Sequence, residues 1–182
     1  NTANVDLEPR YVTVKIGNYQ EDDLNIVLNW EGSFEGIDGP TDFCDIDMDL
    51  ELINADGDYI STSYSNCPES ITMPASMANG VYSLVISLWT NYGETAVIDV
   101  PAAVSIFKIG TLTSTNQDIS AFFPLAAGGL DDGNNSAFIV YTIVKNGTTF
   151  TVTNQANAQI LQGRSQAQYA SILKKIQDKN KK

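Results

Sequence analysis

One short stretch constrains the fold of this chain more than any other feature of its sequence. From Asp45 to Leu52, acidic and apolar residues alternate without a break. Successive side chains of a β-strand point to opposite faces of a sheet, so this alternation predicts a half-buried strand. The predicted core side is Ile46, Met48, Leu50 and Leu52, and the opposite side is Asp45, Asp47, Asp49 and Glu51.

Further runs rich in β-branched and aromatic residues predict more strands along the chain. They cover residues 11–16, 24–30, 59–64, 81–89, 96–100, 103–109, 138–145 and 148–153. The pair Asn146-Gly147, between the last two runs, is typical of a tight hairpin turn. The segment 114–136 is less regular and is expected to be mostly loop. Many short strands with turn signals between them predict an all-β fold, an antiparallel β-sandwich of the jelly-roll or Ig-like type.

The chain changes character after Thr153. Four apolar residues fall at helical spacing behind Ser165, a suitable N-cap: Tyr169, Ile172, Leu173 and Ile176. We therefore expect a β-sandwich domain over 1–153, followed by a polar linker and a basic amphipathic C-terminal helix or tail over 154–182. Three alternatives stay open for this segment: a helix docked on the sandwich, a helix docked on a partner, or a frayed tail.

The charge of the chain excludes several classes of function. Twenty-two acids face ten bases, which gives a net charge of −12, and there is no histidine. An acidic surface repels phosphate backbones, so nucleic acid is not an expected partner. Without histidine there is no Ser-His-Asp triad, and no phosphate-binding loop is present, so we expect no enzyme. No apolar run approaches the roughly 20 residues of a membrane helix.

The two cysteines, Cys44 and Cys67, are placed symmetrically about the predicted turn Asn54–Gly57. On an uninterrupted hairpin they would face each other across the ladder, with Cα atoms about 4.5–5.5 Å apart, within reach of a disulfide. We predict that they pair, although two separate buried thiols remain an alternative. A disulfide would indicate an oxidising compartment, so that the protein is secreted, periplasmic or at the cell surface.

The row of acids on the predicted strand raises the question of what offsets their repulsion. Alternate residues of a strand lie about 6.6–7 Å apart, and solvent, a basic neighbour or a hard cation could compensate such a row. Calcium binds six to eight oxygens and suits these carboxylates. The predicted metal ligands are Asp45, Asp47, Asp49, Asp56 and Asp58. The alternative is a solvated polar face.

Three stretches together resemble a known family. The acidic strand Asp45–Leu52 with its following Asp-Gly turn is similar to that of bacterial pre-peptidase C-terminal-type β-sandwiches. Upstream, Val27–Trp30 resembles the apolar strand ending in Trp, and Asn79–Ile86 resembles a later strand of that family. The resemblance covers residues 24–109, while the cysteines and the insertion Phe34–Asp42 depart from it. It implies an accessory, carbohydrate-binding or adhesion-like role, often with calcium, and no catalysis.

Sugar binding would need exposed aromatic side chains. We predict Trp89 and Tyr92, at the end of a strand, as ligand-binding residues, with Trp30 and Tyr64 as further candidates. Alternatively, both tryptophans belong to the core. The sequence thus predicts a non-catalytic exported binding or accessory module for carbohydrate or protein ligands at the cell surface. A structural subunit of a surface assembly, docking through its C-terminal helix, and a carboxylate-dependent glycoside hydrolase are the alternatives.

Overall fold

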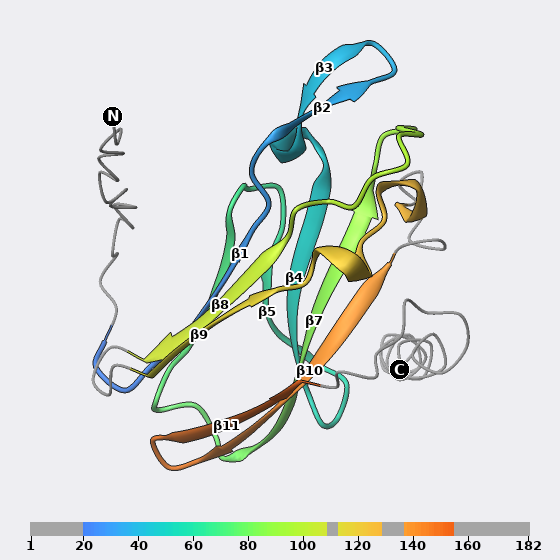
Figure 1. The fold of residues 1–182 in the computed structure, drawn as a ribbon. Coiled ribbons are helices and arrows are strands. Elements are labelled where there is room, and N and C mark those ends of the chain that lie inside the picture. Colours follow the sequence, from blue (N-terminus) through green and yellow to red (C-terminus); the bar gives the residue numbers. More distant parts are fainter. Residues whose placement is uncertain (1–19, 109–112, 129–136, 155–182) are drawn as a thin grey trace, which may run out of the picture.

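The chain folds into antiparallel β-sheets in a computed structural model that describes residues 20–108, 113–128 and 137–154 (Figure 1). One sheet has the strand order β6-β1-β8-β9, made of Glu69–Met73, Leu24–Asn29, Ala103–Lys108 and Thr113–Asp118. The other has the order β11-β10-β7-β4-β5, made of Thr149–Asn154, Phe138–Asn146, Gly80–Thr90, Asp47–Asn54 and Tyr59–Ser63. A hairpin of β2 (Ser33–Gly36) and β3 (Gly39–Asp42) extends from one end. The all-β prediction is confirmed.

Both sheets contribute to one hydrophobic core. Ile26 and Leu28 of β1 and Leu84 and Ile86 of β7 are all 0% exposed and belong to a single cluster of buried side chains. The inward row predicted from the sequence is confirmed, since its members are no more than 2% exposed: Ile46, Met48, Leu50 and Leu52. The alternation of the strand therefore predicts correctly which side chains enter the core between the sheets.

The turn between β4 and β5 is built around the side chain of Asn54. Its Oδ1 accepts hydrogen bonds from the backbone N–H groups of Asp56 and Asp58, both at 2.9 Å, and its Nδ2 donates to Oδ2 of Asp58. Gly57 has φ of +85°, which a residue with a side chain rarely adopts. The Asp-Gly pair in the sequence marks this turn because glycine meets that backbone requirement.

Several elements differ from the sequence-based expectation. Residues 96–100 form no strand and make only an isolated bridge from Asp99 to Pro124, because Pro101 interrupts the run. Strand β9 lies at the edge of its sheet within the segment expected to be loop, and β2, β3 and β6 were also missed. Three short 3₁₀ helices complete the described part: η1 (Phe43–Asp45), η2 (Ser120–Phe122) and η3 (Leu125–Ala127).

Two predictions fall outside the described residues. They are the strand at 11–16 and the linker and helix beyond Asn154. Within the described ranges, no helix is long and apolar enough to cross a membrane.

Candidate functional site

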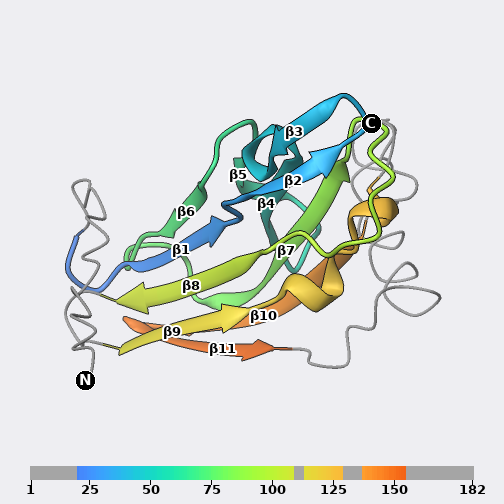
Figure 2. The same cartoon turned by 45° about the horizontal axis from the view of Figure 1, so that its top comes forward.

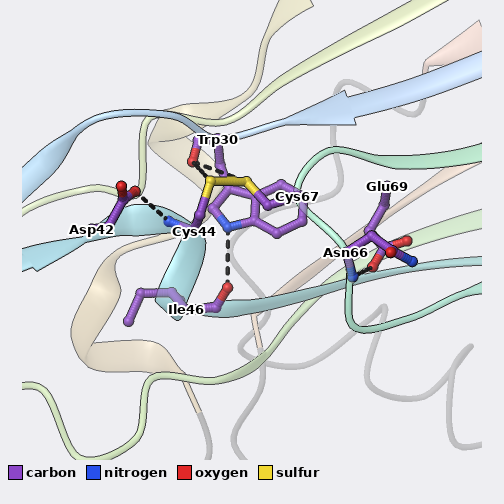
Figure 3. The surroundings of a disulfide bond; sticks show 7 residues. All are labelled: Trp30, Asp42, Cys44, Ile46, Asn66, Cys67 and Glu69. Carbon is purple, nitrogen blue, oxygen red and sulfur yellow. Dashed lines mark hydrogen bonds between the residues drawn. A yellow bond between two sulfur atoms is a disulfide. The ribbon is translucent and has the colours of Figure 1, made fainter.

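Cys44 and Cys67 form a disulfide, as predicted (Figure 3). Their Cα atoms lie 5.5 Å apart. Cys44 belongs to the 3₁₀ helix η1, and Cys67 lies in the connection between β5 and β6, so neither residue is part of the β4–β5 ladder. The bond therefore links the 3₁₀ helix η1 to the β5–β6 connection.

The expected reason for this pairing, a position directly across the ladder, was wrong. The actual register pairs Leu50 with Ser63 and Leu52 with Ser61, and it shifts between Leu52 and Ile53. If the register that pairs Leu50 with Ser63 continued without a shift, the residue opposite position 44 would be 69 and not Cys67. The two cysteines come within 5.5 Å (Cα–Cα) outside that ladder, on η1 and on the β5–β6 connection.

The disulfide lies beside the indole of Trp30 (Figure 3). Its two Sγ atoms are 4.0 and 3.9 Å from the Trp30 carbonyl oxygen, and the Trp30 Nε1 donates to the Ile46 carbonyl at 3.0 Å. Trp30 is 1% exposed, so it belongs to the core, as the alternative interpretation held. These contacts join the disulfide to the start of β4.

Glu69 organises the loop that carries Cys67. Its carboxylate is fully buried and accepts hydrogen bonds from the Asn66 backbone N–H at 2.5 Å and from the Ser63 hydroxyl. A buried carboxylate is tolerated where donors replace the water it has lost. The loop is therefore held by a covalent bond at Cys67 and by a polar anchor at Glu69.

The acidic side of β4 is only partly solvated. Asp45 is exposed and Asp47 is half-buried, whereas Asp49 and Glu51 are 5% and 6% exposed. The hypothesis of a solvated polar face is therefore wrong for these last two residues. They lie on β4, which is flanked by β5 and β7, and the Tyr64 hydroxyl contacts the Glu51 carboxylate.

This burial changes the protonation of the acidic side. Desolvation raises the pKa of Asp49 from its ordinary value of 3.8 to about 8, and the carboxylates of Asp47, Glu51 and Glu69 add to the shift. Desolvation also raises the pKa of Glu51, partly offset by a hydrogen bond that the Tyr64 hydroxyl donates at 3.0 Å. Asp49 is therefore largely protonated at neutral pH and is a poor cation ligand there.

The five predicted metal ligands do not converge on one point. Asp56 and Asp58 belong to the turn after Asn54, whereas Asp45 and Asp47 lie at the other end of β4. A strand of this length separates its ends by about 23 Å, at roughly 3.3 Å per residue. In the described ranges, no group of three or more His, Cys, Asp or Glu residues is arranged to hold a metal ion.

Asp45 and Asp47 do share a hollow with a predicted ligand-binding aromatic. A depression of about 220 Å³ beside the disulfide is lined by these two acids and by Tyr92, which is 67% exposed. Trp89 lies near the end of β7, three residues before Tyr92, and its side chain is half-buried. The structure thus brings Tyr92 next to the acids, whereas Trp89 is not among the residues that line this hollow.

A larger cleft lies between the two sheets, and the sequence analysis missed it. It has a volume of about 650 Å³, and residues of β9 and β11, the edge strands of the two sheets, belong to its lining. These two strands lie side by side in Figure 2. Apolar and aromatic side chains from both sheets make up much of its lining: Leu24, Val104, Ile106, Phe107, Tyr141, Phe150 and Val152. A volume of this size is in the usual range for ligand sites, about 300–1,000 Å³.

Polar contacts between the sheets frame this cleft. The Lys108 ammonium bridges Asp22 at 2.9 Å and the Thr148 carbonyl at 2.7 Å, and it lies 5.9 Å from the centre of the Phe150 ring. The Tyr141 hydroxyl donates to Oε1 of Gln117 at 3.0 Å. These contacts hold β8 and β9 against β10 and β11 while leaving the space between them open.

The two edges of the cleft are chemically alike. Among the described strands, β9 pairs only with β8, and β11 pairs only with β10, so each presents one edge of backbone N–H and C=O groups. The alternation of inward Phe150 and Val152 with threonines is visible in the sequence. Nothing in the sequence predicts that this row of β11 lies opposite β9, because the two strands belong to different sheets and do not pair with each other.

Comparisons with known proteins give no assignment. No family model matches the chain, and searches of curated proteins and of solved structures also return no match.

Proposed function

We propose that this chain is a non-catalytic binding module of an exported protein, and that its two sheets form a β-sandwich. The disulfide supports an oxidising compartment, because such bonds persist outside reducing cytoplasm. One core shared by the two antiparallel sheets supports the sandwich arrangement. The resemblance to bacterial pre-peptidase C-terminal-type domains suggests the same class of accessory role.

The cleft between β9 and β11 is the proposed ligand site, and an extended peptide segment of a protein partner is the proposed ligand. Open strand edges offer hydrogen bonds to an added strand, and apolar pockets beside them select its side chains. This cleft combines both features, with an apolar floor that includes Phe150 and Val152. That combination is the single observation that carries the proposal.

A pair of neighbouring substitutions on β9 tests this site. Thr115 and Asn116 are both exposed, but only Thr115 lines the cleft. Linear peptides selected from a displayed random library on the wild-type protein should bind Thr115→Arg at least tenfold more weakly, a loss of about 1.4 kcal/mol. The same peptides should bind Asn116→Arg as they bind the wild type. Failure to select any peptide, or equal binding to both variants, would contradict the proposal.

Carbohydrate is the second candidate ligand, and one observation favours it. Tyr92 is largely exposed beside the carboxylates of Asp45 and Asp47, and an aromatic face with adjacent polar groups suits a sugar ring. A panel of soluble oligosaccharides should then bind the wild type and Thr115→Arg equally and should lose binding to Tyr92→Ala. Loss of sugar binding in Thr115→Arg alone would instead assign sugars to the cleft.

Calcium remains part of the proposal, restricted to Asp45 and Asp47. A weak site of the extracellular kind, with a Kd of about 10⁻⁴–10⁻³ M, would stabilise the protein by about 1 kcal/mol in millimolar calcium. We expect thermal unfolding to shift upward with calcium in the wild type and in Asp56→Asn, but not in Asp45→Asn/Asp47→Asn. A melting temperature that is the same with calcium and with chelator would reject the site.

A further inference from the structure

The hydrogen-bonding groups of β10 are divided between its two neighbours in a fixed order. In an antiparallel ladder, the N–H and C=O of one residue point to the same neighbouring strand, and successive residues alternate between the two neighbours. The Leu88 N–H donates to the Ala137 carbonyl at 2.8 Å, in register with the β7–β10 ladder. The odd-numbered residues of β10 therefore bond to β7, and its even-numbered residues bond to β11.

The turn after β10 leads independently to the same assignment. The hairpin loop between Asn146 and Thr149 has two residues, and Gly147 in its first position has φ of +59°. Such a loop closes on a hydrogen-bonded pair, here Asn146 with Thr149. Counting on by twos, the odd-numbered residues of β11 bond to β10. The backbone groups of Phe150 and Val152 therefore point to the other edge of β11, which no described strand pairs and which we call the open edge.

On β11 the same two residues supply both kinds of contact that an added strand needs. The side chains of Phe150 and Val152 line the cleft, while their backbone groups point to the open edge. Directly opposite residues of an antiparallel pair place their side chains on the same face. A strand added antiparallel to β11 would therefore insert side chains into the cleft at the residues that exchange hydrogen bonds with Phe150 and Val152.

Strand β9 has the opposite arrangement. The Ile119 N–H donates to the Ala102 carbonyl at 2.9 Å, in register with the β8–β9 ladder, so the odd-numbered residues of β9 bond to β8. The cleft-lining residues of β9, Thr115 and Gln117, therefore use their backbone groups within their own sheet. Their side chains are also polar. An added strand with apolar side chains is better matched to β11.

One end of the cleft is positively charged. Lys108 and Lys145 are the only basic residues in the described ranges, and their ammonium groups lie 5.9 and 5.4 Å from the centre of the Phe150 ring. Lys108 pairs with the Asp22 carboxylate, and Lys145 donates to the Gly147 carbonyl at 2.5 Å. Two ammonium groups thus share one carboxylate partner here, so this end of the cleft suits a further carboxylate.

The direction of the added strand decides which of its residues meets this charge. A strand antiparallel to β11 passes Val152 first and Phe150 second, and it then reaches the β10–β11 turn. In that turn, the Thr148 carbonyl accepts a hydrogen bond from the Lys108 ammonium at 2.7 Å. The next side chain of the added strand on the cleft side comes two residues after the one opposite Phe150. It would therefore lie at Lys108.

We propose that the partner segment of this cleft is a strand that pairs antiparallel with β11 and reads apolar-x-apolar-x-acidic from its N-terminus to its C-terminus. Its two apolar side chains enter the cleft opposite Val152 and Phe150, and its acidic side chain binds Lys108. This assignment rests on the proposed function, since it requires an extended peptide in the cleft. It adds the strand edge, the direction and the sequence pattern of the ligand.

Backbone methylation of the ligand tests the edge. The probe is a synthetic copy of a linear peptide selected on the wild-type protein, methylated at one backbone nitrogen at a time. Methylation at either apolar position should weaken binding about tenfold, because it removes an N–H that bonds to β11. Methylation at the residue between them should leave binding unchanged. The reverse pattern, or equal losses at all three positions, would overturn the assignment.

A charge exchange tests the direction. The acidic residue of the probe peptide is replaced by its amide, and both peptides are measured on the wild type and on Lys108→Met. On the wild type the amide peptide should bind about threefold more weakly, whereas Lys108→Met should bind both peptides equally. Equal binding of both peptides to the wild type would overturn the assignment whether or not Lys108→Met folds. A difference that persists on Lys108→Met would overturn it as well.

The cleft and the ligand pattern can fail separately. Equal binding of the selected peptides to Thr115→Arg and Asn116→Arg would remove the cleft as the site, and the ligand pattern with it. Selected peptides that distinguish these two variants but lack the apolar-x-apolar-x-acidic pattern would leave the cleft as the site and overturn only the pattern.

Discussion

Replacing Asp49 by asparagine is expected to stabilise the protein at pH 8 by about 2–4 kcal/mol. Asn has nearly the same shape as Asp but carries no ionisable proton. The Asp49 carboxyl is 5% exposed and has a pKa of about 8, raised first by desolvation and then by Asp47, Glu51 and Glu69. Forcing this group to ionise inside the folded protein costs free energy that the unfolded chain does not pay.

The pH dependence has a definite sign. Because the pKa of Asp49 is higher in the folded state, the folded protein holds this proton where the unfolded chain has already released it. The contribution of Asp49 to stability is complete below about pH 4 and is lost as the pH rises from about 4 to 8. The raised pKa of Glu51 acts in the same direction. Wild-type stability should therefore fall between pH 5 and pH 8.

Urea denaturation at pH 5 and at pH 8 measures this effect. The stability difference between Asp49→Asn and the wild type should be small at pH 5 and should grow toward pH 8. Asp45→Asn is the matched control, because it removes an exposed acid from the same acidic segment. A constant difference between Asp49→Asn and the wild type at both pH values would show that Asp49 is ionised in the folded protein.

Removing the disulfide is expected to cost roughly 3 kcal/mol of unfolding free energy. Cys44 and Cys67 are 23 residues apart, and the bond restricts the unfolded chain over that loop. In the folded protein it also links η1 to the β5–β6 connection, next to the buried Trp30. Cys44→Ala/Cys67→Ala should therefore unfold at a clearly lower urea concentration than the wild type.

Reduction provides the control for this prediction. A reducing agent should lower the wild-type midpoint to nearly that of Cys44→Ala/Cys67→Ala and should leave the double variant unchanged. Thiol counting on the denatured, unreduced wild type should find no free cysteine. Two free thiols in that assay, or a double variant as stable as the oxidised wild type, would contradict the structure.

Local patterns in the sequence were enough for much of the fold. The alternation of β4 and the turn residues Asn54 and Gly57 identify their elements through interactions within a few residues. The hairpin of β10 and β11 follows from Asn146-Gly147 for the same reason. Strands β6 and β9 escaped prediction because Glu69–Met73 and Thr113–Asp118 lack a strong pattern of their own and are strands through pairing with β1 and β8.

The candidate sites were less accessible to sequence reasoning. The disulfide partners were predicted, but their geometry was not, because Cys44 and Cys67 lie outside the β4–β5 ladder, on η1 and on the β5–β6 connection. Tyr92 and the acids of the small hollow were found separately, and only the fold brings them together. The larger cleft was missed entirely, since its walls come from strands far apart in the chain, such as Val104 on β8 and Phe150 on β11.

The sequence by itself determined which side chains of β4 enter the core, because neighbours along a strand must point to opposite faces. Only the tertiary structure decided whether Asp49 and Glu51 on the opposite face meet water. Their burial depends on what packs around β4, including the neighbouring strands β5 and β7, and so does the protonation of Asp49. Local geometry sets the direction of a side chain, whereas exposure and pKa depend on whatever else the chain packs beside it.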